Sequence, residues 1–236
     1  MDTSCSLPDG LVACRNCDLN AICRLTGLIA YEEGRSRRAT GAMRSLRTGA
    51  TLYSAGTHAT TLFAIRSGMI KRVEFTADGE ERVVSFHTPG EVLGLEAFGT
   101  GTYSCDAIAL GRVQCCELPL PALTDESPRT AVIARQLVQL LSRAADVHPA
   151  FARGTARQRV TAFLLDLAER MRSRGFSGND LHLEMSRLEI ANLLDTRIET
   201  VSRTLQQLHR ERAIHVSGSH VRLLALEPLR ELASSA

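Results

Sequence analysis

The chain has 236 residues, of which 44% are hydrophobic and 23% charged, and its formal net charge is only +2. This composition is typical of a globular protein with one large domain or two small ones, and the charge alone does not indicate a nucleic-acid-binding protein. It has no run of about 18 apolar residues and no basic-then-apolar leader, which excludes a membrane-spanning helix and predicts a cytoplasmic protein.

Three cysteines lie close together near the start of the chain, at Cys14, Cys17 and Cys23. In a cytoplasmic protein, clustered thiols are more often metal or redox ligands than a disulfide scaffold. Residues 1–30 are therefore expected to form a segment whose order depends on a ligand. From the residues alone, an iron–sulfur cluster, a zinc site and unligated thiols all remain open. The polar, arginine-rich stretch 31–45 is expected to be a solvated helix or a linker.

From about residue 46 to 120, short runs of strand-forming residues alternate with turn signals. Asp78-Gly79 is a hairpin signal between two such runs, and Pro89-Gly90 follows another. Many short strands at this spacing predict a β-sandwich or a jelly-roll barrel. The expected strands are Leu62–Ile65, Met69–Phe75, Arg82–Phe86, Ala107–Leu110 and Val113–Leu118.

Residues 128–148 follow a helical pattern that has two interleaved apolar stripes. One stripe can pack on the barrel. The other then needs a partner, and the simplest is the same helix of a second subunit; a helix buried on both sides within one monomer is the alternative. Pro149 is expected to end or kink the helix. The first stripe is Ile133, Leu137, Leu140, Ala144 and Val147, and the stripe expected at the dimer interface is Ala131, Ala134, Val138, Leu141 and Ala145.

A second domain is expected to begin near residue 153. Its first element is an amphipathic helix over Thr155–Arg174. Near the C-terminus, Ile214–Val216 and Val221–Leu224 predict the two strands of a β-hairpin wing.

Between them, two capping boxes, Ser186-x-x-Glu189 and Thr196-x-x-Glu199, predict a short helix followed by a longer one, the outline of a helix-turn-helix. The longer helix has an apolar stripe that we expect to face the core, made of Ile198, Val201, Leu205 and Leu208. Its opposite face carries side chains suited to base edges and phosphates: Arg197, Glu199, Ser202, Arg203 and Gln206. The structural alternative is a helical pair with an ordinary solvated face.

The order of barrel, long helix and winged helix-turn-helix resembles the CRP/FNR family of bacterial transcription regulators over nearly the whole chain. The stretches that carry the resemblance are Ile65-Arg-Ser-Gly68, Pro89-Gly-Glu-Val-Leu-Gly94, Arg174-Gly-Phe-Ser177 and Ile198-Glu-Thr-Val-Ser-Arg203. Within the family, the chain resembles the FNR-type oxygen sensors, which carry Cys-x2-Cys-x5-Cys and a later cysteine before Glu-aliphatic-Pro. Cys116-Glu-Leu-Pro119 matches that later cysteine.

The resemblance implies an α+β fold, with a cyclic-nucleotide-binding-like jelly-roll barrel, a long dimerisation helix and a C-terminal winged helix-turn-helix. The implied divisions are a cluster-binding segment at 1–30, a sensory barrel at 31–127, a dimerisation helix and hinge at 128–152, and a DNA-binding domain at 153–236.

The resemblance also implies a [4Fe-4S] cluster held by Cys14, Cys17, Cys23 and Cys116, which oxygen would destroy or convert. With the cluster intact, such a protein forms a homodimer and binds an FNR-like inverted repeat in double-stranded promoter DNA, controlling anaerobic or microaerobic genes without enzymatic activity. The implied reading residues are Glu199, Ser202 and Arg203, joined by Arg197 and Thr200. The implied RNA polymerase contacts are Thr76–Glu80, Ser67 and Phe176.

Other effectors are possible on the same scaffold. Regulators of the CRP branch bind a cyclic nucleotide through an arginine that follows a Gly-Glu pair. Here Gly90-Glu91 is followed by Tyr103–Asp106, which contains no arginine, so we expect no cyclic nucleotide site. A CRP-like regulator with a structural zinc or redox thiol site, and an electron carrier that uses the cluster, are the alternatives.

Overall fold

The computed structural model describes residues 11–25, 29–32, 35–38, 42–120, 130–146 and 154–234. Its internal contacts divide the chain into two compact units, 1–74 with 86–141 and 75–85 with 142–236. Among the described residues, no helix is long and apolar enough to cross a membrane. Pro149 lies outside the described residues, and so does the side chain of Ala145.

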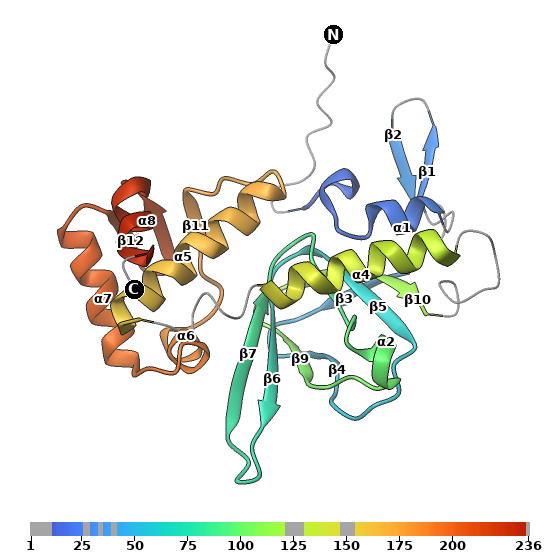
Figure 1. The fold of residues 1–236 in the computed structure, drawn as a ribbon, viewed down its shortest axis with the longest axis horizontal. Coiled ribbons are helices and arrows are strands. Elements are labelled where there is room, and N and C mark those ends of the chain that lie inside the picture. The colour runs from blue at the N-terminus through green and yellow to red at the C-terminus, as the bar shows by residue number, and fades with distance from the viewer. Residues whose placement is uncertain are drawn as a thin grey trace. The chain divides into compact units, whose positions relative to one another are not determined.

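Two four-stranded sheets form the β-domain, with the strand orders β3-β10-β5-β8 and β4-β9-β6-β7 (Figure 1). The strands are β3 (Met43–Leu46), β4 (Thr51–Tyr53), β5 (Thr61–Ser67), β6 (Ile70–Phe75), β7 (Glu81–His87), β8 (Val92–Leu93), β9 (Asp106–Ala109) and β10 (Val113–Pro119). A short helix, α2 (Ala97–Thr100), follows β8. The predicted β-domain is confirmed, and its five expected strands correspond to β5, β6, β7, β9 and β10. The others have only two to four residues, too few to show a period.

Strands β5 and β10 separate two apolar clusters, because successive side chains of a strand point to opposite faces. Phe63, Ile65 and Cys115 belong to the cluster in the barrel interior. Leu62 and Leu118 belong to a second cluster on the outer face of the sheet. The barrel therefore has an apolar outer face that other elements of the same unit must cover.

Two helices cover the outer face, one that precedes the barrel in the sequence and one that follows it. The 3-10 turn η1 (Cys14–Asn16) leads to the first, helix α1 (Asn20–Leu25), and the second is helix α4 (Thr130–Asp146) (Figure 1). On α4, Ile133 and Leu137 are buried in the outer cluster, as predicted for the first stripe.

The second stripe of α4 lies open in this chain. Val138 is 60% exposed, Leu141 is 39% exposed, and Ala134 is also exposed. These three side chains therefore do not fit the alternative in which both stripes are buried within one monomer.

The expected helix or linker over residues 31–45 is wrong. Strands β1 (Ile29–Glu32) and β2 (Arg35–Arg38) form an antiparallel hairpin there, and β3 follows at Met43. A polar, arginine-rich composition does not exclude a strand when a neighbouring strand supplies backbone hydrogen bonds.

The second unit contains the helices α5 (Ala156–Ser173), α6 (Arg187–Leu193), α7 (Ile198–Arg210) and α8 (Leu226–Ser234). Its three-stranded sheet has the order β11-β13-β12 and is made of β11 (Asp180–His182), β12 (Ile214–Ser217) and β13 (His220–Leu223). The predicted winged helix-turn-helix is confirmed. Thr155 caps α5 in a capping box with Gln158, so the helix begins where its sequence pattern begins.

We predict that Gly68→Ala destabilises the barrel more than Gly49→Ala. Both glycines have a left-handed φ, +75° and +76°, which costs an L-residue about 1–2 kcal/mol. At Gly68 an added Cβ would also lie 2.3 Å from the Arg112 carbonyl oxygen, whereas at Gly49 it would meet nothing within 4 Å. We expect a loss of about 3 kcal/mol in the free energy of unfolding for Gly68→Ala, against about 1 kcal/mol for the control.

Urea unfolding followed by tyrosine fluorescence measures this difference. The chain has no tryptophan, and all three tyrosines, Tyr31, Tyr53 and Tyr103, belong to the first unit. Equal losses in the two variants would contradict the close approach at Gly68.

Candidate cluster site and nucleic-acid interface

The cysteine segment is attached to the barrel by backbone hydrogen bonds. The Val12 N–H donates to the Arg66 carbonyl oxygen at 2.8 Å, and the Asp18 N–H donates to the Gly90 carbonyl oxygen at 2.9 Å. Beyond these points, Leu19 and Ile22 are buried and pack in the outer cluster.

Three of the four predicted ligands converge on the outer cluster. Cys17, Cys23 and Cys116 are partly buried and pack against it, although Cys116 lies about ninety residues further along the chain. Strand β10 brings Cys116 to this face by pairing it with Ala64 of β5, whose side chain belongs to the same cluster. The structure therefore brings the remote cysteine to the N-terminal segment.

Cys14, the remaining predicted ligand, is held by polar contacts. Its Sγ accepts a hydrogen bond from Arg66 Nη1 at 3.0 Å, and its carbonyl oxygen accepts one from Asn20 Nδ2 at 2.8 Å. The Cys17 N–H donates to the same carbonyl oxygen at 3.1 Å and closes the turn η1. Arg66 belongs to β5 and lies fifty-two residues from Cys14 in the sequence, so no local pattern indicated this contact.

The environment of Cys17 disfavours its free thiolate. Burial raises the pKa of Cys17 to about 12, and the nearby thiols of Cys23 and Cys116 raise it as well. Because the pKa is raised, the thiol is protonated at neutral pH. A positively charged inorganic core would relieve both the burial penalty and the repulsion between the thiolates.

Two further cysteines among the described residues, Cys105 and Cys115, are not part of the outer cluster. Cys115 is fully buried in the barrel interior, on the opposite face of β10 from Cys116, and burial raises its pKa to about 12. Cys105 is also fully buried, and its Sγ accepts a hydrogen bond from Arg72 Nε at 2.9 Å. Cys115 therefore cannot replace Cys116 without reversing the strand.

The donor set fits a cluster better than a single ion. Among the described residues, no group of three His, Cys, Asp or Glu side chains is arranged to hold a metal ion. Four thiolates are the usual ligands of a four-iron cluster, where each binds a different iron, whereas zinc draws its ligands to about 2.3 Å from one centre. The four thiols of Cys14, Cys17, Cys23 and Cys116 have the donor chemistry of the first case.

The barrel interior contains a cation, Arg72, which lies outside the Tyr103–Asp106 stretch that follows Gly90-Glu91. Arg72 Nη2 lies 3.1 Å from a carboxylate oxygen of Glu96, and Arg72 also donates to Cys105. Beside it, the rings of Tyr53 and Tyr103 stack with their centroids 3.9 Å apart. The guanidinium is thus already engaged by the protein's own side chains.

The first helix of the helix-turn-helix begins as predicted. Ser186 accepts a hydrogen bond from the Glu189 N–H, and the Glu189 side chain accepts one from the Ser186 N–H. The capping box expected at Thr196 is wrong. Helix α7 begins two residues later, at Ile198. Its N-cap is Arg197, whose side chain accepts no capping hydrogen bond from the described residues.

The start of α7 also corrects the expected core stripe. Val201, Leu205 and Leu208 are buried, and Thr204 is buried beside them, but Ile198 is 39% exposed. As the first helical residue, Ile198 lies at the edge of the core and has no preceding helical turn beside it. All five predicted reading residues lie at the N-terminal half of α7 and are exposed or half-buried: Arg197, Glu199, Thr200, Ser202 and Arg203.

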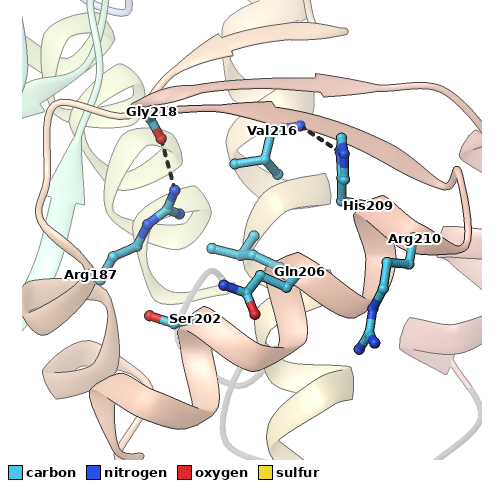
Figure 2. A pocket seen from close by; sticks show the side chains of 8 residues that line it. Arg187, Ser202, Gln206, His209, Arg210, Val216 and Gly218 are labelled. Atoms are coloured by element: carbon cyan, nitrogen blue, oxygen red, sulfur yellow. Dashed lines mark hydrogen bonds between the residues drawn. The ribbon is translucent and has the colours of Figure 1, made fainter.

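A cavity of about 540 Å³ lies between α7 and the wing (Figure 2). At one side, Arg187 Nη2 donates to the Gly218 carbonyl oxygen at 2.9 Å. At the other, the Val216 N–H donates to His209 Nδ1 at 3.2 Å. The lining residues are Arg187, Ser202, Leu205, Gln206, His209, Arg210, Val216 and Gly218.

The cavity can accept an anion. Arg187 Nη1 is buried and makes no hydrogen bond to any described residue, and burial lowers the pKa of Arg187, so the cation is incompletely solvated. A phosphate oxygen is a suitable partner for such a guanidinium. Sequence reasoning missed Arg187, although its place directly after the N-cap Ser186 was a usable signal.

Comparison with known proteins agrees with both halves of the fold. Residues 43–127 match the cyclic nucleotide-binding domain model, and residues 158–232 match the Crp-like helix-turn-helix domain model. The transcriptional activator protein Anr of Pseudomonas aeruginosa is 34% identical, over 89% of this chain and 88% of that protein. The fumarate and nitrate reduction regulatory protein of Escherichia coli K12 is 30% identical, over 94% and 90%. The structure of FixK2 from Bradyrhizobium japonicum aligns with a TM-score of 0.74 at 27% identity, covering 84% of this chain and all of FixK2.

We predict that Ser186→Ala lowers the free energy of unfolding of the second unit by about 1 kcal/mol, because it removes one half of a formed capping box. Thr196→Ala is the matched control, since Thr196 is not the N-cap of α7, and we expect it to cost less than about 0.5 kcal/mol. Urea unfolding followed by circular dichroism at the helical band compares the two. A larger loss for Thr196→Ala would restore the capping box that the sequence suggested.

Proposed function

The chain belongs to the CRP/FNR family of transcription regulators, and from that premise we propose that it is an oxygen-responsive switch whose cysteine segment controls dimerisation and DNA binding. It is a DNA-binding regulator of the FNR/Anr type and not an enzyme. The observation that carries the proposal is the convergence of Cys17, Cys23 and Cys116 on the apolar cluster that also holds α4.

In this proposal, Cys14, Cys17, Cys23 and Cys116 hold a [4Fe-4S] cluster. When bound, the cluster supplies an oxygen-labile cross-link between the N-terminal segment and β10. The thiolate of Cys17 binds in place of the protonated thiol that burial and the nearby Cys23 and Cys116 favour without it. The donor set supports this assignment, and so does the likeness to the FNR-type sensors.

The route from the cysteines to dimerisation runs through packing. Leu19 and Ile22 lie in the same apolar cluster as Ile133 and Leu137 of α4. Release of the segment would remove two buried side chains from beneath α4 and loosen it. The opposite face of α4 carries Ala134, Val138, Leu141 and Ala145, which we assign to the homodimer interface. A second copy covers an apolar stripe that this chain leaves exposed.

A dimer presents two copies of α7 to the two halves of an inverted repeat. We assign Glu199, Ser202 and Arg203 to base reading, with Arg197 and Thr200 beside them, and an FNR-like half-site (TTGAT) in double-stranded promoter DNA as the target. Glutamate accepts from cytosine N4, and arginine donates bidentately to guanine. The exposed tip Thr76–Glu80, with the half-buried Ser67 and Phe176, is the proposed contact with RNA polymerase.

The deciding experiment compares Cys116→Ala with Cys115→Ala in protein purified without oxygen. We expect Cys116→Ala to lose the iron and the DNA binding, because a ligand is gone. Cys115→Ala removes a buried barrel thiol and should keep both, at a cost in stability of about 1 kcal/mol. Iron content, visible absorbance and binding to a palindromic site are the measurements.

A colourless wild-type protein that binds equally well with and without air would overturn the proposal. A protein that holds one zinc ion instead would favour a structural metal and a different effector.

Base reading is tested separately with Arg203→Ala. We expect affinity for the palindromic site to fall by about 1–3 kcal/mol per half-site, with relaxed preference at one base pair. Arg212→Ala serves as the control, since it removes an exposed arginine that lies beyond the end of α7. Fluorescence anisotropy with the palindromic site and with single-base variants of its half-sites measures the affinities. An equal loss of affinity for all of these sites would assign Arg203 to a phosphate contact instead.

A further inference from the structure

Arg66 faces the cysteine segment from β5. Leu62 and Ala64 of this strand point to the outer cluster, and the alternation of the strand gives Arg66 the same direction. Ile65 pairs with Cys115 and Ser67 pairs with Gln114, so Arg66 is also the extra residue of a β-bulge.

The side chain and the backbone of Arg66 both contact the cysteine segment. Nη1 donates to Cys14 Sγ at 3.0 Å, and the Arg66 carbonyl oxygen accepts from the Val12 N–H at 2.8 Å. Cys17, Cys23 and Cys116 pack against the outer cluster, and Cys14 receives this hydrogen bond. The orientation of Cys14 therefore depends on a charged side chain of the barrel.

We propose that Arg66 is a positioning residue for the iron–sulfur site, holding Cys14 Sγ in place. This inference rests on the proposed function. A guanidinium presents its donors in a rigid planar fork, so its charge-assisted hydrogen bond fixes the direction of the sulfur that accepts it. Hydrogen bonds to ligand sulfurs and nearby charges set the stability and potential of such clusters.

Two other arginines, Arg15 and Arg24, lie within the cysteine segment. Both are exposed, whereas Arg66 is half-buried and donates to Cys14 Sγ. Since Arg66 is attached to β5, it also links the orientation of Cys14 to the sheet that carries Cys116.

The test uses the full chain, purified without oxygen, as wild type, Arg66→Gln, Arg66→Lys and the control Arg15→Gln. The rate at which a ferrous chelator removes iron is measured, together with the Fe–S(Cys) stretching bands in the resonance Raman spectrum. We expect Arg66→Gln to lose iron about ten times faster and to shift these bands, because the sulfur loses its charged donor. Arg66→Lys should recover part of the loss, and Arg15→Gln should stay within about two-fold of wild type, because exposed charges contribute little.

Urea unfolding of the iron-free proteins separates positioning from general stability. Wild-type bands and a wild-type rate of iron loss in Arg66→Gln would overturn the inference. Equal impairment of the glutamine and lysine variants, with earlier unfolding of both iron-free proteins, would reduce Arg66 to a structural residue and overturn it too. A wild-type protein that holds no iron would overturn the proposed function, and this inference with it.

Discussion

The apolar cluster that Leu19 and Ile22 share with Ile133 and Leu137 is the contact on which the sensory half depends. Burying two such side chains contributes about 3–6 kcal/mol, whereas ordering a backbone costs about 1–2 kcal/mol per residue. Residues 11–25 therefore cannot be held by this packing alone. The hydrogen bonds at Val12 and Asp18 add to the packing, and the proposed ligand shared with β10 would supply the rest.

This balance suits a switch. A segment that carried its own core would stay folded whatever its ligand did, and a segment without Leu19 and Ile22 would have no influence on α4. In the proposed dimer, the exposed second stripe of α4 would make association sensitive to small changes beneath the first stripe. Because a dimer engages both halves of an inverted repeat, a modest shift in association becomes a larger shift in DNA occupancy.

Helix α7 and the wing are held by contacts within the second unit. Helix α7 takes its position from Val201, Leu205 and Leu208, and the wing is attached to α7 through the His209–Val216 hydrogen bond. The groove between them places the incompletely paired guanidinium of Arg187 beside Ser202. Phosphate binding at such a groove would orient α7 without reading any base, which complements base contacts by Glu199 and Arg203.

The sequence alone predicted the α+β fold, the five longer barrel strands, the two stripes of α4 and the capped start of α6, because each is recorded in local periodicity or cap chemistry. It failed where pairing or context overrides local preference: the β1–β2 hairpin, the shortest strands, and the true start of α7 at Ile198.

What only the tertiary structure decided is which distant residues meet. The alternation of β10 puts Cys115 and Cys116 on opposite faces, and that of β5 directs Arg66 toward Cys14. A sequence motif identifies the cysteines. Their hydrogen-bond donors and packing neighbours come from strands that are distant in the sequence, and no local periodicity encodes that proximity.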